Sequence, residues 1–274
     1  MKPVAFDYMR AGTLETACAL LSEQPGAKLL AGGQSLGPML NLRLAQPALL
    51  IDITRIPELA RVEVSADAIT FGSIVTHAAI EDRRVADPTN GFLARVAGGI
   101  AYRAVRTRGT IGGSLAHADP AADWVSALTA LKAELSITDP SGQRRTPVSE
   151  FVRGAMATTL GHDEIIDGIV IPKLSPQARC GYHKICRKTG EFAEAIGVAV
   201  FDPERGICRV VVGAGGGRPT LIEDFSGTDR LLTAFAETHS GRECLIQAGV
   251  KGDDYQMQIH AVAVRRAVQE LARA

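Results

Sequence analysis

The segment Leu30-Ala31-Gly32-Gly33-Gln34-Ser35-Leu36 decides how the first part of the chain folds. A short apolar run over residues 28–31 is typical of a buried strand, and the two glycines stop it. Helical spacing returns over residues 35–44, where four apolar side chains fall on one side: Leu36, Met39, Leu40 and Leu44. The segment is therefore predicted to join a strand to a helix.

The residues around this segment continue the alternation of helices and strands. Thr13 is predicted to cap a helix over residues 14–21, which Pro25 and Gly26 end. Residues 49–53 form a second apolar run that is typical of a buried strand. The chain up to residue 53 thus follows the order helix, strand, helix, strand, which indicates a small α/β unit.

The middle of the chain combines helical and strand patterns. Residues 61–73 carry Ala66-Asp67 between two apolar runs, as a β-hairpin does. Further helices and strands are predicted from the apolar spacing, the helices over 77–85, 92–105 and 121–131 and the strands over 135–137 and 165–171. Residues 109–120 are rich in glycine and small polar side chains and are predicted to form a loop.

A change of domain is predicted at residues 172–179, which contain two prolines and a serine. We expect a first domain over residues 1–172, with subdomains of about 1–55 and 56–172, and a second domain over residues 173–274. In the second domain the patterns predict an antiparallel meander followed by two helices, over 182–187, 195–201, 208–213, 229–237 and 258–272. The expected fold class is α+β.

Composition and charge exclude several classes of protein. The 274 residues include 30 Lys plus Arg and 30 Asp plus Glu, so the formal net charge is zero, and no nucleic-acid partner is expected. No apolar run approaches the roughly 18 residues of a membrane span, and the N-terminus lacks the apolar core of a signal peptide. The five cysteines form no C-x-x-C pair, so no metal site is expected on this chain. We expect a cytoplasmic protein without a transmembrane segment.

A second glycine segment, Thr110-Ile111-Gly112-Gly113-Ser114, resembles the first in its chemistry. Each segment places paired glycines beside a predicted helix start and follows them with a hydroxyl side chain. Glycines allow successive N–H groups to point into one concavity, and a helix N-terminus favours an anion. Ser35, Thr110 and Ser114 can add hydroxyl donors. Two such segments can hold the two phosphates of one pyrophosphate from opposite sides.

Either glycine segment alone is more often a tight turn than a ligand site. Neither matches the Rossmann or the Walker pattern. Residues 213–217, Gly-Ala-Gly-Gly-Gly, look more like a nucleotide loop, but Arg218-Pro219 follows and no helix begins there. That stretch is interpreted as a flexible turn.

Taken together, the two segments resemble those of the carbon monoxide dehydrogenase medium-subunit family, which supplies the FAD-binding subunits of molybdenum hydroxylases. Their order and spacing match, and so do four other stretches, residues 41–45, 50–53, 163–166 and 182–193. The similarity runs from Phe6 to Ala267. It implies a two-part FAD-binding domain like that of xanthine dehydrogenase and vanillyl-alcohol oxidase, followed by a C-terminal α+β domain with an antiparallel sheet and helices.

The same resemblance implies a cofactor site. In the family, FAD contacts both glycine segments and residues further along the chain. Carried onto this sequence, the site consists of Ala31, Gly32, Gly33, Gln34, Ser35, Leu36, Thr110, Gly112, Gly113, Ser114, His117, Asp123, Ile166, Lys184 and Phe192.

Two polar residues of this set have alternative interpretations. Asp123 matches an acidic residue that contacts the ribose or adenine side, where a carboxylate accepts hydrogen bonds from hydroxyls. It could instead be a first-turn residue that the helix dipole favours. His117 and Asp119 could suggest a metal pair, but a third ligand at metal spacing is missing, so His117 is expected to line the FAD cleft.

Three residues are matched to positions near the flavin ring. Ile166 could touch the cofactor and still be an ordinary buried strand residue. Lys184 could favour a negative charge on the reduced ring, or be a solvent-facing strand residue. Phe192 occupies a position that is often Tyr in the family, so ring packing would remain while a phenolic hydrogen bond would be lost. The alternative for Phe192 is a core residue.

The function implied by the resemblance is electron transfer. FAD on this chain would accept electrons from the [2Fe–2S] clusters of a small partner subunit and pass them to an external acceptor. A large partner subunit would carry the molybdenum cofactor, and the expected assembly is a dimer of heterotrimers. No catalytic residue is expected on this chain. The alternatives are a self-sufficient flavin oxidoreductase that acts on substrate, and a non-catalytic binding module.

Overall fold

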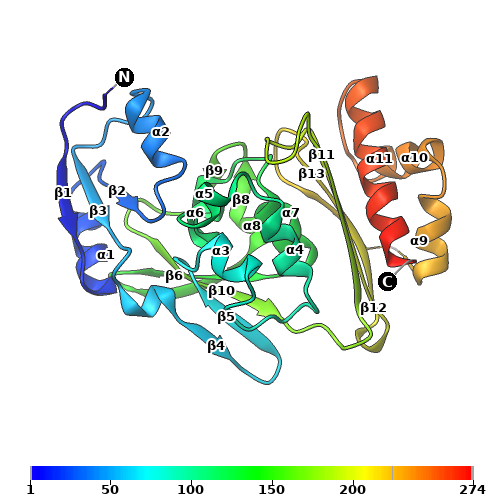
Figure 1. Cartoon of the computed structure of the whole chain (residues 1–274), viewed down its shortest axis with the longest axis horizontal. Coiled ribbons are helices and arrows are strands. Elements are labelled where there is room, and N and C mark those ends of the chain that lie inside the picture. The colour runs from blue at the N-terminus through cyan, green and yellow to red at the C-terminus, as the bar shows by residue number, and fades with distance from the viewer. Residues whose placement is uncertain (1, 224, 273–274) are drawn as a thin grey trace.

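The computed structural model describes residues 2–223 and 225–272. Three sheets follow one another along the longest axis of the molecule, from a small N-terminal unit through a middle unit to a C-terminal sheet with helices on its outer face (Figure 1). The mixture of helices and separate sheets confirms the expected α+β class.

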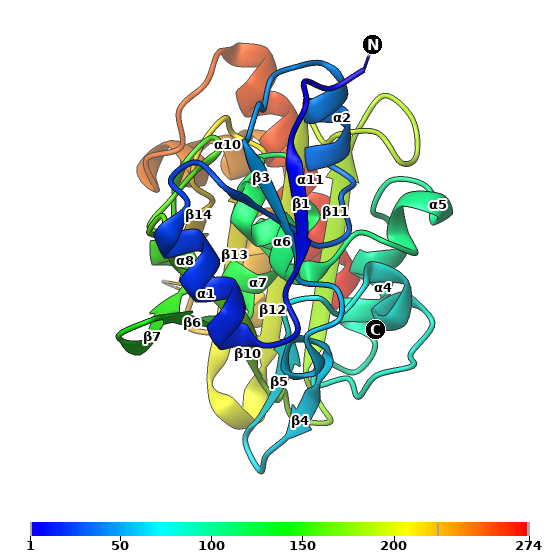
Figure 2. The same ribbon diagram turned by 90° about the vertical axis from the view of Figure 1, so that its left-hand side faces the viewer.

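The N-terminal unit is a three-stranded parallel sheet in the order β1-β3-β2. Its elements are β1 (Asp7–Arg10), α1 (Leu14–Glu23), β2 (Lys28–Leu30), α2 (Leu36–Asn41) and β3 (Leu49–Asp52). The Thr13 side chain accepts a hydrogen bond from Thr16 N and caps α1, as predicted. The alternation of helix and strand is confirmed. Figure 2 shows this unit in front of the rest of the chain.

Two details of this unit differ from the prediction. Strand β1 was not predicted because all four of its residues are exposed, so it has no apolar pattern. Helix α2 is shorter than residues 35–44. It ends at Asn41, and Arg43 has a φ of 60°, which a helix does not continue through.

The middle unit is built on a five-stranded sheet in the order β4-β5-β10-β6-β7. Its strands are antiparallel: β4 (Val62–Val64), β5 (Ala68–Gly72), β6 (Glu134–Asp139), β7 (Gly142–Pro147) and β10 (Ile165–Pro172). The hairpin predicted over residues 61–73 is β4 and β5. Residues 57–60 form a short 3-10 helix, and α8 (Val148–Phe151) leads into a small hairpin of β8 (Val152–Gly154) and β9 (Ala157–Thr158).

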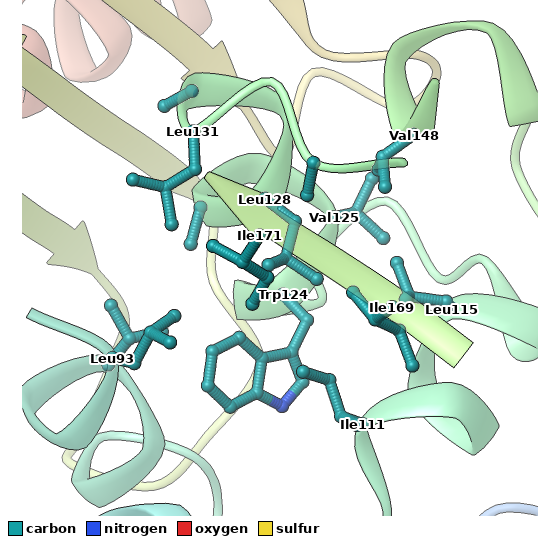
Figure 3. Packing of buried hydrophobic residues seen from close by; sticks show 14 of the residues in the cluster. Leu93, Ile111, Leu115, Trp124, Val125, Leu128, Leu131, Val148, Ile169 and Ile171 are labelled. Carbon is teal, nitrogen blue, oxygen red and sulfur yellow. The ribbon is translucent and has the colours of Figure 1, made fainter. Parts of the chain in front are cut away.

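Short helices cover this sheet around one fully buried tryptophan. They are α3 (His77–Glu81), α4 (Phe92–Gly98), α5 (Arg103–Arg106), α6 (Ile111–His117) and α7 (Asp123–Ala130). Trp124 is 0% exposed and packs among Leu93, Ile111 and Leu128 (Figure 3). Its apolar surroundings form the main core of the chain.

The helix predicted over residues 92–105 is two helices. Ala101 lies between them with a φ of 42°, outside the helical region. The Arg106 guanidinium donates hydrogen bonds to the carbonyl oxygens of Ile100 (2.9 Å) and Ala101 (3.0 Å), so these groups are satisfied without a helix.

The prediction of a loop over residues 109–120 was wrong, because residues 111–117 form α6. Glycine disfavours a helix interior, which is why the glycine content indicated a loop. At Gly112 the fold requires glycine, since a Cβ there would lie 2.4 Å from the Cβ of Ser73. The Thr110 side chain caps the helix by accepting a hydrogen bond from Gly113 N.

The C-terminal unit is the predicted antiparallel meander with helices on one face. Its strands, in spatial order, are β11 (Arg179–Ile185), β12 (Ala195–Asp202), β13 (Ile207–Gly213) and β14 (Thr220–Ile222). The helices are α9 (Thr228–Ala234), α10 (Thr238–Gln247) and α11 (Asp254–Leu271). Helix α10 was not predicted, because few of its residues are apolar and only Gly241 and Leu245 are buried.

Strand β12 is buried on both faces. Ile196, Val198 and Val200 belong to the core around Trp124, whereas Ala199 packs with helix α11 on the other side. A Cβ on Gly197 would lie 2.4 Å from Ala263 O of α11, so the helix approaches the sheet closely at this glycine. Because the main core includes strands on both sides of residue 172, the division into domains 1–172 and 173–274 stays a prediction.

Candidate functional site

A cleft of about 790 Å³ opens between the N-terminal and middle units. Its wall includes both glycine segments, the start of α7, the end of the β9–β10 connection and the loop between β11 and β12. All the residues expected at the cofactor line it except one: Ala31, Gly32, Gly33, Gln34, Ser35, Leu36, Thr110, Gly112, Gly113, Ser114, His117, Asp123, Ile166 and Phe192. The exception is Lys184.

The first glycine segment presents free backbone donors. Among the residues that the structure describes, none accepts a hydrogen bond from the N–H groups of residues 32–35. Gly33 has a φ of +69°, a conformation that side chains rarely adopt, so glycine is required for this turn. Successive N–H groups around such a turn make a concavity for an anion.

The second glycine segment differs from this expectation, because its backbone donors are occupied. The first four N–H groups of α6 all donate within the chain: Ile111 to Val75 O (3.0 Å), Gly112 to Ser73 O (2.9 Å), Gly113 to Thr110 Oγ1 (3.1 Å) and Ser114 to Thr110 O (3.0 Å). The segment is therefore not a second set of free N–H groups. It offers the cleft its glycine surface and the hydroxyls of Thr110 and Ser114.

The first glycine segment touches the two residues that directly precede the second segment. A Cβ on Gly32 would lie 2.0 Å from the carbonyl oxygen of Arg108 and 2.9 Å from the Cα of Gly109. Any larger residue at position 32 would therefore push the segments apart. The two paired-glycine motifs that the sequence singled out form one continuous wall.

Asp123 and Lys184 form a buried ion pair at the edge of the cleft. Lys184 Nζ lies 2.8 Å from Asp123 Oδ1 and donates a second bond of 2.8 Å to Gly99 O. The Tyr182 hydroxyl donates to the same Asp123 oxygen. Burial and the carboxylate raise the pKa of Tyr182 well above its usual value, so the phenol stays protonated.

Lys184 is the one expected residue that the structure places away from the cleft wall, and its role near the flavin stays a prediction. Its ammonium is turned toward Asp123 and is 10% exposed, and the residue is not on the cleft wall. The physical reason is that a buried ammonium needs a carboxylate and a carbonyl acceptor, both of which lie on this side of β11. It is not the solvent-facing strand residue of the alternative interpretation either.

Ile166 and Phe192 both line the cleft but differ in burial. Ile166 is 5% exposed, which agrees with the alternative interpretation of a buried strand residue. Phe192 is 76% exposed on the loop between β11 and β12, so the alternative of a core residue is wrong. The loop is held by Gly190, where a Cβ would lie 2.9 Å from Ala101 O. Tyr102 is also exposed beside the cleft, which gives this part of the wall an aromatic surface.

His117 and Asp119 line the cleft without forming a metal site. Within residues 2–223 and 225–272, no three His, Cys, Asp or Glu side chains lie close enough together to hold a metal ion. In the same part of the chain, no helix is long and apolar enough to cross a membrane.

His77 lines the cleft although no sequence pattern singled it out. It is 5% exposed, and its Nδ1 accepts a hydrogen bond of 3.0 Å from Trp124 Nε1. Burial, and secondly the charge of Arg106, lower the pKa of His77 to about 4, so the ring is neutral. A histidine on the apolar side of a predicted helix has no pattern that separates it from a core residue.

Residues 4–174 match the family described as FAD binding domain in molybdopterin dehydrogenase. The chain belongs to this family. The residues present fit FAD on physical grounds as well. The first segment has four unpaired N–H groups for a pyrophosphate, and the glycines bring the backbone close to the cleft.

Relatives that match most or all of the chain are named as a medium subunit of a hydroxylase and a medium chain of a dehydrogenase. The nicotine 6-hydroxylase medium subunit of Paenarthrobacter nicotinovorans is 34% identical over 100% of this chain and 96% of its own length. The carbon monoxide dehydrogenase medium chain of Hydrogenophaga pseudoflava is 35% identical over 85% of this chain and 82% of its own length.

Among solved structures, this chain superposes with a TM-score of 0.89 on a chain of the carbon monoxide dehydrogenase from Hydrogenophaga pseudoflava. That enzyme was solved in a form that lacks the Mo-pyranopterin moiety of the molybdenum cofactor. It is 28% identical and covers 100% of this chain and 99% of the matched chain. Together with the family match, this confirms the resemblance that the sequence carried. The chain is an FAD-binding oxidoreductase subunit of the xanthine dehydrogenase family.

Proposed function

We propose that the chain holds FAD in the cleft between the N-terminal and middle units and serves as the electron-transfer subunit of a molybdenum hydroxylase. The observation that carries this proposal is the row of unpaired N–H groups over residues 32–35 in a chain of the FAD-binding family. When bound, FAD exchanges electrons singly or in pairs, and the protein supplies its position and electrostatic surroundings.

The proposed contacts follow the cleft wall. The first segment, Ala31 to Leu36, binds the pyrophosphate. Thr110, Gly112, Gly113 and Ser114 of the second segment complete the pocket by close approach and hydroxyl donation, and His117 lines it. Asp123 accepts hydrogen bonds from ribose hydroxyls through Oδ2, to which no described residue donates.

The flavin ring is proposed to lie against Ile166 and Phe192. The side chain of Phe192 is exposed beside Tyr102, and an aromatic surface of this kind favours a planar ring system. Lys184 has a supporting role in this proposal, because it orients Asp123 and does not reach the cleft wall.

The proposed partners are a large subunit with the molybdenum cofactor and a small subunit with two [2Fe–2S] clusters, assembled as a dimer of heterotrimers in the cytoplasm. Support comes from the relatives, which are named medium subunits or medium chains. Those two relatives belong to enzymes named for nicotine and for carbon monoxide. The substrate is therefore proposed to be selected by another chain, and a self-sufficient oxidoreductase is not favoured.

The structure offers little for direct substrate chemistry. Glu164, a carboxylate of the cleft wall, is bound by the Arg144 guanidinium at 2.5 and 2.7 Å. That ion pair is the largest cause that lowers the pKa of Glu164, so the carboxylate is poorly suited to act as a general base.

The test is to purify the chain alone and together with its co-expressed partners. We expect the isolated chain to bind FAD, with absorbance at about 450 nm, and to oxidise no substrate of the complex. In the complex, adding substrate without an acceptor should bleach that absorbance. Substrate oxidation by the isolated flavoprotein would instead support the self-sufficient enzyme, and a complex without iron and molybdenum would contradict the proposed partners.

A further inference from the structure

The ring of His77 lies directly behind the point where the two glycine segments meet. Gly109 separates it from the first segment: a Cβ on Gly32 would lie 2.9 Å from Gly109 Cα, and a Cβ on Gly109 would lie 2.9 Å from both Cδ2 and Nε2 of His77. The backbone N–H of His77 donates to Gly109 O at 2.9 Å. Because neither Gly32 nor Gly109 has a side chain, the edge of the imidazole lies close to the anion-binding turn.

The hydrogen-bond partner of His77 determines which ring nitrogen carries the proton. Trp124 Nε1 is only a donor, and it lies 3.0 Å from His77 Nδ1 in a fully buried environment. Nδ1 is therefore the acceptor. Since the ring is neutral, Nε2 carries the hydrogen and is a donor.

The Nε2–H group has no acceptor within the described part of the chain, yet it is open to the cleft. His77 is on the cleft wall, and Nε2 is not among the buried side-chain atoms that lack both a partner and access to solvent. Its position at the cleft points to an acceptor that the cleft binds.

The backbone of the second glycine segment cannot supply this donor. The first four N–H groups of α6 are occupied, two by the carbonyl oxygens of Ser73 and Val75 and two by Thr110. Where the two segments meet, the His77 imidazole therefore offers a nitrogen donor that the backbone of α6 does not. The structural alternative, in which His77 only accepts the Trp124 bond, explains Nδ1 but leaves Nε2 unexplained.

We propose that His77 is a cofactor-binding residue whose Nε2–H donates a hydrogen bond to a pyrophosphate oxygen of FAD where the two glycine segments meet. This inference rests on the proposed FAD cleft. It assigns the second phosphate-binding donor to a side chain of α3 instead of to the backbone of α6. Trp124 is then a positioning residue, because it holds the imidazole in the donating tautomer.

Two substitutions separate the two nitrogens of the ring. In His77→Asn the side-chain oxygen can replace Nδ1 as the acceptor for Trp124, but nothing replaces Nε2–H. In His77→Gln the longer side chain can place its NH2 group near the former Nε2, at the expense of the Trp124 bond. H77N should therefore impair phosphate binding while it preserves folding, and H77Q should do the reverse.

The experiment measures dissociation constants of the FAD-free full-length chain for three probes: FAD, ADP and riboflavin. ADP contains the pyrophosphate without the flavin, and riboflavin contains the flavin without phosphate. We expect H77N to weaken FAD and ADP binding by a similar factor of about 10 to 100, the usual range for a hydrogen bond to a charged group. Riboflavin binding should not change, and H77Q should retain most of the FAD affinity. Thermal unfolding of each variant shows whether it is folded.

Gly33→Ala provides the control for the cleft itself, because it strains the turn of the first segment at a φ of +69°. If G33A weakens FAD binding while H77N binds FAD and ADP like the wild type, the role of His77 is wrong and the cleft stands. Equal weakening of riboflavin binding by H77N would also overturn the inference, because it would indicate a general structural effect. If G33A too binds FAD normally, the proposed cleft fails.

Discussion

Lys184 Nζ and Asp123 Oδ1 lie 2.8 Å apart, and this ion pair joins the C-terminal sheet to the first turn of α7 at the cleft. The two side chains are 10% and 9% exposed. Tyr182, two residues before Lys184 on the same face of β11, donates to the same oxygen. The cleft carboxylate is thus held by the C-terminal unit, whereas the glycine segments belong to the N-terminal and middle units.

Removal of the ammonium should destabilise the chain strongly. Lys184→Met leaves a buried carboxylate without its counter-ion, so we expect the free energy of unfolding to fall by about 3 kcal/mol. Urea unfolding of the FAD-free protein measures this. The matched control is Lys132→Met, which breaks an exposed pair with Glu223 and should cost less than about 1 kcal/mol. Equal effects of the two variants would contradict a buried ion pair that matters for stability.

The close approach of the glycine segments predicts a sharp effect at position 32. In Gly32→Ala, a Cβ would lie 2.0 Å from Arg108 O, so the segments must separate and the FAD affinity should fall by at least about 10-fold, as one lost charge-assisted contact predicts. Equilibrium dialysis with FAD measures the change. Gly37→Ala, in the helix that follows, meets nothing within 4 Å and should bind FAD normally. Normal binding by G32A would show that the contact between the segments is not needed.

Much of the fold could be predicted because burial leaves a pattern in the sequence. The apolar runs of β3, β10 and β12 each contain buried residues, and they indicated strands. Strand β1 is exposed and left no such pattern. Helix α6 was not predicted because glycine has a low helix propensity. Its glycines are required by tertiary contacts, such as that between Gly112 and Ser73, and helix propensity does not include such contacts.

The cofactor site could be predicted in part for a related reason. Glycine motifs mark a close approach of the backbone, and both motifs do line one cleft. The sequence could not tell that the N–H groups of Ile111 and Gly112 donate to Val75 and Ser73, because that pairing depends on a contact far along the chain. For the same reason it could not tell that Lys184 turns to Asp123 or that His77 reaches the cleft.

The neutral His77 predicts a pH dependence of stability. Its folded pKa of about 4 lies below the usual 6.5, so the unfolded chain binds the proton more readily. The contribution is fully present above pH 6.5 and is lost as the pH falls toward 4. It amounts to about 3 kcal/mol over this range.

Urea unfolding of the FAD-free chain at pH 7 and pH 4.5 tests this prediction by comparison of variants. Since His260 and His183 also have lowered pKa values, H77Q should still lose stability on acidification, but less steeply than the wild type. The pH-dependent loss should be clearly smaller in H77Q than in the wild type. His239→Gln, at a surface histidine, should leave the loss unchanged. An identical loss in H77Q would mean that His77 does not stay neutral in the folded chain.

Phe192 should contribute to flavin binding without contributing to folding. Its side chain is 76% exposed, so Phe192→Ala should change the free energy of unfolding of the FAD-free chain by less than about 0.5 kcal/mol. Ring packing against the flavin is worth roughly 0.5–1.5 kcal/mol, which corresponds to a loss of about 2- to 12-fold in affinity for FAD and for riboflavin.

ADP separates this effect from that of His77, because it has no flavin ring. We expect F192A to bind ADP like the wild type, whereas H77N binds it more weakly. Phe192→Tyr keeps the ring and should retain the FAD affinity. If F192A lowers ADP affinity as much as FAD affinity, the loop between β11 and β12 supports the phosphate end of the cleft and the proposed position of the flavin is wrong. If F192A weakens only riboflavin binding and H77N weakens only ADP binding, the flavin lies at Phe192 and the pyrophosphate lies at His77.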